Sequence, residues 1–470
     1  MFTKITVLIW ADMLTVYALW MLMIYLTDVW KVTFVHAAGI LNIYLAVAGV
    51  LPLILQFIVD TLVGSYWVLL LSSLSFSTGM GFLTMSTPPV LHKVTGTCGS
   101  YEPDCIGDTQ KALLYTALPL LAIGTAGHTV SLPSFLEEQI SNVILNLTPR
   151  VCLADFFGSF AAFAIGCFAV MGLAYIKPWS LRFGIPAIII LVATLIFLTR
   201  SCSYVYVGPQ GSHLATVFKV LMAATSKLFR RLPADDKELH GMSDLAKPRT
   251  TGLRCLDKAA IVLPDQSVEE QQKTWKLWTI SEVEATKFII SLIPMSMSFV
   301  FFGLVSSLGY TFFVEQGKHM NRKVGKLTVP LTIFWWFCDQ ASSYFPKVFS
   351  CFFSLVCRKN AQERAPIAGI MMSMLLGILC SITAAKVESR RLDVVKSHGL
   401  LDKPDETIPM TVFWLLPQFL LLGALNGMYD MSLQSYYSYY ISPTMFKYML
   451  QIGRIGESLG FVGGIVAVYV

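Results

Sequence analysis

Charged residues are scarce in this sequence. Of its 470 residues, only 14% are Asp, Glu, Lys or Arg, whereas soluble domains usually carry roughly 25%. Apolar residues make up 55% of the chain, and the mean hydropathy is +0.63. They fall in blocks of about 20 residues, the length that a helix needs to cross the hydrocarbon core of a bilayer. This pattern excludes a soluble globule and a disordered chain, and it predicts an all-α, polytopic membrane protein.

The sequence also lacks the usual signatures of catalysis and cofactor binding. It contains no Cys/His metal-ligand spacing, no nucleotide-binding glycine loop and no arrangement typical of a nucleophile. The net charge of +6 comes from basic residues that lie mostly between the apolar blocks, so nucleic-acid binding has little support. We therefore expect no cofactor, no metal site, no nucleic-acid partner and no enzymatic activity.

The apolar blocks predict about eleven membrane spans in two groups. The first group lies near residues 5–26, 38–59, 66–87, 112–132, 153–176 and 182–200. The second group lies near 284–314, 327–356, 366–386, 409–429 and 446–470. We therefore divide the chain into an N-terminal half (1–200), a basic linker loop (201–283) and a C-terminal half (284–470).

The charge of the linker predicts its side of the membrane. It is rich in Lys and Arg, and basic loops tend to stay on the cytoplasmic side. Six spans before the linker would place the N-terminus on that side as well. The loop with Cys98 and Cys105 would then face the opposite side, where these residues can form a disulfide or remain free thiols.

Several strings distributed along the chain resemble one family. They are LPLILQFIVDTLVGSYW (51–67), GTAGHTVSLPSFLEEQ (124–139), WSLRFGIPAI (179–188), CLDKAAIV (255–262), FFVEQGKHM (312–320), AAKVESRRL (384–392) and FWLLPQFLLLGALNG (413–427). The chain resembles the plant nitrate/peptide transporters, which form the proton-dependent oligopeptide transporter family. The resemblance implies the major facilitator fold, with two halves of the six-helix type. It also implies a small-molecule or anion substrate, with protons as a further candidate partner, in the plasma or vacuolar membrane.

The sequence departs from this family at its charged residues. Members usually have twelve helices, so the twelfth is apparently missing here. The family's Glu-x-x-Glu-Arg cluster falls on Leu8, Ala11 and Asp12, and its fourth-helix lysine falls on Thr129. A tenth-helix glutamate falls on Asn426. Because an unpaired charge in the membrane is costly, the loss of these groups together is coherent. Proton coupling by the usual residues is therefore doubtful.

Five ionisable residues within the predicted spans are site candidates, together with Thr129 and Asn426. Asp12 could be a titratable group in the cavity or a hydrated carboxylate near the cytoplasmic end of its helix. His128 could shuttle protons or be a neutral histidine that hydrogen-bonds between helices. Asp339 is a further cavity candidate. Arg454 and Glu457 either pair with each other, or Arg454 binds an anionic group of the substrate.

A gate is predicted at the turn after the second span. The resemblance places the superfamily's Gly-x-x-x-Asp gating motif here, with Asp60 as its acid and Gly64 four residues later. Gln56 stands where the motif has glycine, and Ser65 stands where it has a basic residue. We expect a transporter of small solutes that works by alternating access. The alternative is a degenerate, non-transporting member that acts as an interaction or regulatory protein.

Overall fold

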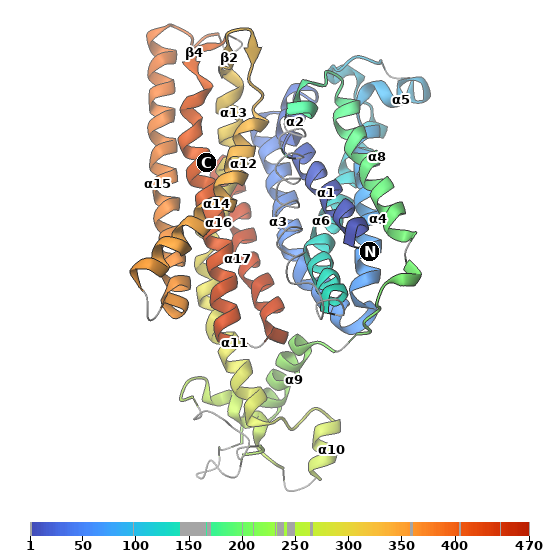
Figure 1. Cartoon of the computed structure of the whole chain (residues 1–470), viewed down its shortest axis with the longest axis vertical. Helices are drawn as coiled ribbons and strands as arrows, with labels where there is room; N and C mark the ends of the chain where they lie inside the picture. Colours follow the sequence, from blue (N-terminus) through green and yellow to red (C-terminus); the bar gives the residue numbers. More distant parts are fainter. Residues whose placement is uncertain are drawn as a thin grey trace.

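The computed structural model describes residues 2–96, 98–141, 166, 171–199, 201–209, 211–230, 232, 239–241, 250–263, 267–357, 361–403, 406–441 and 443–469. The helices form two groups that stand side by side, with the linker at one end of the molecule (Figure 1). We call that end the linker side and the opposite end the far side. The boundaries of the two halves and the linker, at residues 200 and 283, stay a prediction.

The N-terminal half is built from long helices that run between the two sides. Its described elements are α1 (Phe2–Leu19), α2 (Leu22–Asp28), α3 (Phe34–Ile58), the π-helical turn η1 (Val59–Val63), α4 (Gly64–Met85), α5 (Pro88–Thr95), η2 (Pro103–Cys105), α6 (Asp108–Ser141), α8 (Trp179–Leu198) and η4 (Ser201–Ser203). Most of the predicted span at 153–176 lies outside the described residues. Cys98 and Cys105 are joined in a disulfide.

The C-terminal half follows the same plan. Its described elements are α11 (Ile280–Ser298), α12 (Val300–Tyr310), α13 (Phe312–His319), β1 (Met320–Asn321), β2 (Lys323–Val324), β3 (Leu327–Thr328), α14 (Thr332–Val356), α15 (Ala361–Ser397), β4 (Ile408–Thr411), η8 (Val412–Leu415), α16 (Leu416–Tyr440) and α17 (Pro443–Tyr469). On the far side, β1 pairs in parallel with β4, and β2 pairs antiparallel with β3.

The length and composition of the helices fit a membrane protein. Eight described helical segments are long and apolar enough to cross a bilayer, and two of these cover 52 and 40 residues. The longer one contains α3, η1 and α4, which turn back on each other at the linker side. The predicted number of eleven spans stays a prediction.

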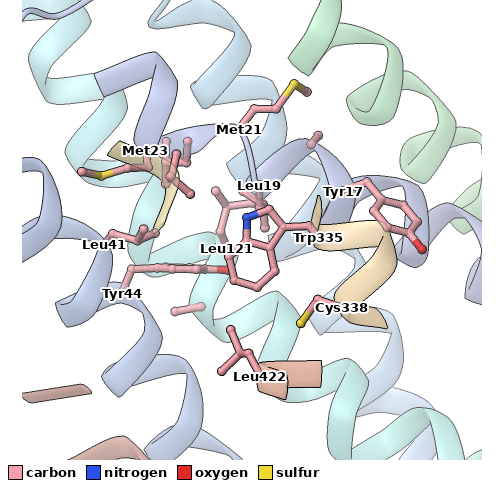
Figure 2. Packing of buried hydrophobic residues seen from close by; sticks show 14 of the residues in the cluster. Tyr17, Leu19, Met21, Met23, Leu41, Tyr44, Leu121, Trp335, Cys338 and Leu422 are labelled. Carbon is pink, nitrogen blue, oxygen red and sulfur yellow. The ribbon is translucent and has the colours of Figure 1, made fainter. Parts of the chain in front are cut away.

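The two halves meet in one continuous apolar core. Trp335 of α14 lies among residues of α1 and α3, including Tyr17, Leu19 and Tyr44 (Figure 2). The indole of Trp335 stacks on Trp20, with 5.5 Å between ring centroids. Small residues allow the closest approach: a Cβ atom on Gly49 of α3 would lie 2.1 Å from Ser458 Oγ of α17. The halves therefore pack directly along these helices.

The linker folds into a small unit of its own. It contains α9 (His213–Ser226), η7 (Arg254–Ala260) and α10 (Val268–Lys273). Apolar residues of α9 and η7 form a separate core with Ile280 and Val283, which belong to the first turn of α11. The capping box of Thr279 and Glu282 starts α11 at this point. The linker unit is thus attached to the C-terminal half.

A buried ion pair strengthens this attachment. Lys287 Nζ of α11 lies 2.6 Å from Asp257 Oδ1 of η7 and 2.7 Å from Glu284 Oε1. The side chains of Lys287 and Asp257 are 4% and 0% exposed. Asp257 belongs to the CLDKAAIV string, so the structure gives that string a role in holding the linker on α11.

Candidate functional site

Two of the candidate residues meet in the core of the N-terminal half. His128 Nδ1 of α6 lies 3.0 Å from Asp12 Oδ1 of α1, and His128 Nε2 lies 2.9 Å from Ser73 Oγ of α4. His128 is 2% exposed. Asp12 is therefore hydrogen-bonded to another helix, while its side chain remains 26% exposed. Both interpretations of Asp12 stay predictions. The two residues lie far apart in the sequence, and only the fold of the N-terminal half brings them together.

Ser73 connects this pair to the backbone of α4. Its Oγ lies 2.8 Å from the carbonyl of Leu69 as well as 2.9 Å from His128 Nε2. The His128 ring is therefore held between the Asp12 carboxyl group and a hydroxyl group that is itself bound to a helix backbone.

A second group of candidates lies where the two halves face each other. Tyr17 of α1 donates to Asp339 Oδ2 of α14 at 3.4 Å. Tyr310 stacks on Trp335, with 4.3 Å between ring centroids. The Tyr310 hydroxyl is within electrostatic range of Tyr44, Asp339 and Glu457. Aromatic rings of both halves and carboxylates of the C-terminal half thus lie around Tyr310.

Arg454 and Glu457 lie one turn apart on α17. Among the described residues, the ion pairs within 4 Å do not include these two, and Arg454 Nη1 donates to Gln451 Oε1 at 3.5 Å. The two residues still interact electrostatically with each other, and both interact with Asp430 of α16.

Sequence reasoning missed Asp430. The predicted span ended at residue 429, because the residues that follow are more polar, whereas α16 continues to Tyr440. Asp430 therefore lies well inside a helix and not at its end. The signal that could have found it is the helical length: a span that begins at residue 416 and covers about 20 residues must include position 430.

The predicted gate residue Asp60 joins the two halves at the linker side. Asp60 Oδ2 accepts a hydrogen bond from Tyr448 Oη of α17 at 2.5 Å, and Asp60 Oδ1 accepts one from Gln56 Nε2 at 3.0 Å. Gln56 therefore supports the acid from the position that the motif gives to glycine. Ser65 donates to Glu138 Oε2 of α6 at 2.6 Å.

Gly64 is required by the backbone at this turn. Its φ is 80° and its ψ is 171°, a region that is essentially restricted to glycine. A Cβ atom here would also lie 2.9 Å from the carbonyl oxygen of Val207. A pocket of about 530 Å³ opens beside the turn, and its lining includes Asp60, Glu137 and Lys447. Lys447 of α17 contacts Glu137 of α6 at 3.7 Å, which is a second link between the halves.

An ion pair and hydrogen bonds also link the halves at the far side. Lys318 Nζ of α13 lies 2.8 Å from Asp28 Oδ1 of α2, and it donates to Thr27 Oγ1 at 2.8 Å. Tyr175 donates to the carbonyl of Thr328 at 3.0 Å. The path between the halves is therefore crossed by polar contacts at both ends.

Comparison with known proteins identifies the scaffold. Residues 66–461 match the POT family. Protein NRT1/ PTR FAMILY 5.5 of Arabidopsis thaliana is 37% identical over 468 residues, which cover 97% of this chain and 86% of the relative. This chain belongs to the POT family. A further relative is Protein NRT1/ PTR FAMILY 5.6 of the same plant, which is 28% identical. That match covers 90% of this chain and 74% of the relative.

Solved structures of POT family proteins share the fold. An auto-inhibited POT family peptide transporter has a TM-score of 0.66 at 15% identity, covering 99% of this chain and 88% of that chain. A POT family transporter in complex with 5-aminolevulinic acid has a TM-score of 0.60 at 10% identity. That match covers 99% of this chain and 89% of that chain. The predicted family and the major facilitator fold class are confirmed. The protein is a membrane transporter scaffold of this family.

In this POT family member, the positions of the lost charges lie inside the protein. Leu8 and Ala11 are 0% and 1% exposed. Thr129 Oγ1 donates to the carbonyl of Thr125 one turn earlier, and Asn426 Oδ1 accepts from Ser306 Oγ at 3.0 Å. The Thr129 and Asn426 side chains thus form hydrogen bonds within their own halves. Their role in a cavity stays a prediction.

Proposed function

We propose that this protein carries a small solute across the plasma or vacuolar membrane by alternating access, with the linker on the cytoplasmic side. The observation that supports this most directly is the pair of contacts between the halves at opposite ends. Asp28 and Lys318 join the halves at the far side, and Asp60 and Tyr448 join them at the linker side. Breaking one set while the other holds would expose the interior to one side at a time.

The substrate class follows from the family and from the interior. We propose nitrate, an organic anion, a small peptide or a hormone-like metabolite. Related structures are described as peptide transporters, and one holds 5-aminolevulinic acid. Arg454 is the cation that we assign to an anionic group of the solute, because its guanidinium makes no ion pair within 4 Å among the described residues.

We further propose that transport is not driven by the proton gradient through the family's usual residues. Leu8, Ala11 and Thr129 cannot titrate. Asp12 and His128 contact each other between two helices of the same half, and Ser73 contacts the other ring nitrogen. A rocking motion of one half against the other leaves these contacts intact, so the transport cycle does not change the surroundings of this pair.

Flux into proteoliposomes tests this function. Nitrate and a dipeptide are offered with and without a pH gradient, and then with a proton ionophore. We expect uptake of at least one solute at a rate that the ionophore does not change. An Asp12→Asn variant serves as the control for any residual pH effect. Uptake that collapses with the gradient would contradict uncoupled transport, and absence of flux for all family substrates would support the non-transporting alternative.

A further inference from the structure

The first residues of the linker cross the gate at the linker side. We call Val205 to Pro209, together with Gly211 and Ser212, the strap. It follows η4, at the end of the N-terminal half. It leads into α9, which is the first helix of the linker unit. The strap therefore connects the two halves directly beneath the contact between Asp60 and Tyr448.

Most of the strap is bound to the N-terminal half. Gln139 of α6, which is 1% exposed, donates to the carbonyl of Val205 at 2.9 Å and accepts from its N–H at 3.0 Å. The carbonyl of Val207 lies against Gly64, where no side chain would fit. Gly211 N–H donates to the backbone carbonyl of Asp60 at 2.9 Å. These contacts fix the strap to the ends of α6 and η1.

The last residue of the strap is bound to the C-terminal half. Ser212 Oγ lies 2.7 Å from Tyr448 Oη of α17, and both side chains are buried. Tyr448 donates its only hydroxyl proton to Asp60, so Ser212 must donate to Tyr448. The result is a chain of donors that runs from the linker through α17 to the N-terminal half.

The attachment of the linker to α11 determines how the halves can move without breaking these hydrogen bonds. Because η7 is held on α11 by Lys287 and Asp257, the module beyond Ser212 moves with the C-terminal half. When the halves separate at this side, the strap cannot stay bound to both of them. The contacts that cross between the halves at this side are those of Tyr448 with Asp60 and of Lys447 with Glu137 and Ser134, and these must break.

We propose that the strap is a working part of the linker-side gate, in which Ser212 stabilises the closed state by orienting Tyr448 toward Asp60. This inference rests on the proposed alternating access. It assigns to the linker a role in setting how readily the gate opens, and it makes Ser212 and Tyr448 positioning residues.

Hydrogen exchange of the full chain in lipid nanodiscs tests the proposal without any substrate. In a Tyr448→Phe variant, which keeps the contact of Lys447 with Glu137, we expect amides of the strap and of the linker-side ends of α3 and α17 to exchange at least about fivefold faster, because the hydrogen bonds of Tyr448 to Asp60 and Ser212 are lost. In Ser212→Ala, the same segments should respond in the same direction but less. The double variant should not exceed Tyr448→Phe, since both changes act on one chain of hydrogen bonds.

Two controls separate gate opening from unfolding. Tyr429→Phe removes a buried hydroxyl that donates to Gly453 within the C-terminal half, and it should leave the strap unchanged. Amides of η7 should keep wild-type exchange in every variant, which shows that the linker unit remains folded.

The proposal is overturned if Ser212→Ala loosens the strap while the ends of α3 and α17 exchange as in the wild type. It is also overturned if Tyr448→Phe has no effect on the strap. Flux measured on the same variants distinguishes the two proposals: a chain that carries no solute, but whose Ser212→Ala variant still loosens the gate, contradicts the transport function alone.

Discussion

At the residue scale, the interior of the N-terminal half retains one titratable pair in place of a larger set of charges. Asp12 and His128 satisfy each other, and Ser73 satisfies the remaining ring nitrogen. Burial of either group alone would leave a polar atom without a partner, which is expensive in a low-dielectric core. The pair should therefore behave as one unit.

We expect Asp12→Leu and His128→Leu to be strongly non-additive. His128→Leu leaves the Asp12 carboxyl group without its contact to the imidazole and should destabilise the protein by about 1–3 kcal/mol. The double variant should cost less than the sum of the two single changes, with a coupling of about 0.5–3 kcal/mol. Thermal unfolding in detergent, followed by tryptophan fluorescence, measures this. Additive single effects would contradict a direct interaction between the two side chains.

Gly64 gives a second prediction at this scale. Gly64→Ala should destabilise the protein by about 1–3 kcal/mol, because alanine is strained at this φ and ψ and its Cβ would press on Val207. Gly81→Ala, on the same helix, is the matched control, since an added Cβ there has nothing within 4 Å. The unfolding temperature of the Gly64→Ala variant should therefore be lower than that of Gly81→Ala. Equal values would show that the turn relaxes easily.

At the scale of elements, the linker unit depends on a few buried polar groups of η7, α9 and α11. Lys287 carries the ion pair that joins η7 to α11. Lys227 follows α9 and donates to the backbone carbonyls of Ala259 and Ile261 at 3.3 and 2.6 Å. Both lysines are nearly inaccessible to solvent. Their charges make the linker sensitive to substitution and to pH.

Lys287→Met should loosen the linker strongly. It leaves the carboxylate of Asp257 buried without its cation, and the loss of one partner from a buried pair costs about 3–5 kcal/mol. Replacing both residues, as Lys287→Met with Asp257→Leu, should recover much of this. The control is Lys403→Met, because the pair of Lys403 and Glu406 is exposed and contributes at most about 1 kcal/mol. Exchange of the η7 amides reports each effect.

The pKa of Lys227 predicts a pH dependence for the same unit. Burial, with repulsion from Lys276 as a smaller cause, lowers the pKa of the Lys227 ammonium from 10.5 to about 8. Between these values the unfolded chain binds more protons than the folded one, so stability of the linker should rise with pH. Below pH 8, Lys227 adds no pH dependence. Exchange of the η7 amides, corrected for intrinsic rates, should show this rise in the wild type and not in Lys227→Met.

At the scale of the whole molecule, the close packing of α3 on α17 decides how the halves fit together. Gly49→Ala places a Cβ atom 2.1 Å from Ser458 Oγ, which must rotate away from its bond to the carbonyl of Arg454. We expect a lower unfolding temperature and slower flux. Gly39→Ala, on the same helix with nothing within 4 Å of its added Cβ, should be neutral. An equal response of the two variants would mean that the halves are not tightly fitted at Gly49.

The sequence predicted the family and the fold class, because these depend on hydropathy and on local strings. The gate at Asp60 stays a prediction. The sequence could not predict that Asp12 meets His128, since that contact exists only in the folded N-terminal half. Spacing suggested a pair of Arg454 and Glu457, but it could not show that Arg454 donates to Gln451 instead of forming a short ion pair. Asp430 was missed because hydropathy falls before the helix ends.

Charge on the far side is also explained at this scale. Lys318, Arg391 and Lys403 lie in segments that the topology places outside, against the usual bias of basic residues. Lys318 pairs with Asp28, Arg391 with Glu388, and Lys403 with Glu406. These basic residues are thus matched by acids, which reduces their conflict with the positive-inside rule.

Helix α15 has 37 residues, so its length is about 55 Å, well beyond the roughly 30 Å of a hydrocarbon core. It reaches the far-side edge of the molecule (Figure 1), where Arg390 covers the ring of Trp414. The end of such a long helix is a suitable place for an epitope that an antibody fragment can bind. An epitope grafted after Ser397 would be recognised without permeabilisation if that tip lies outside the cell, and only after permeabilisation of the vacuolar membrane if it lies in the vacuole.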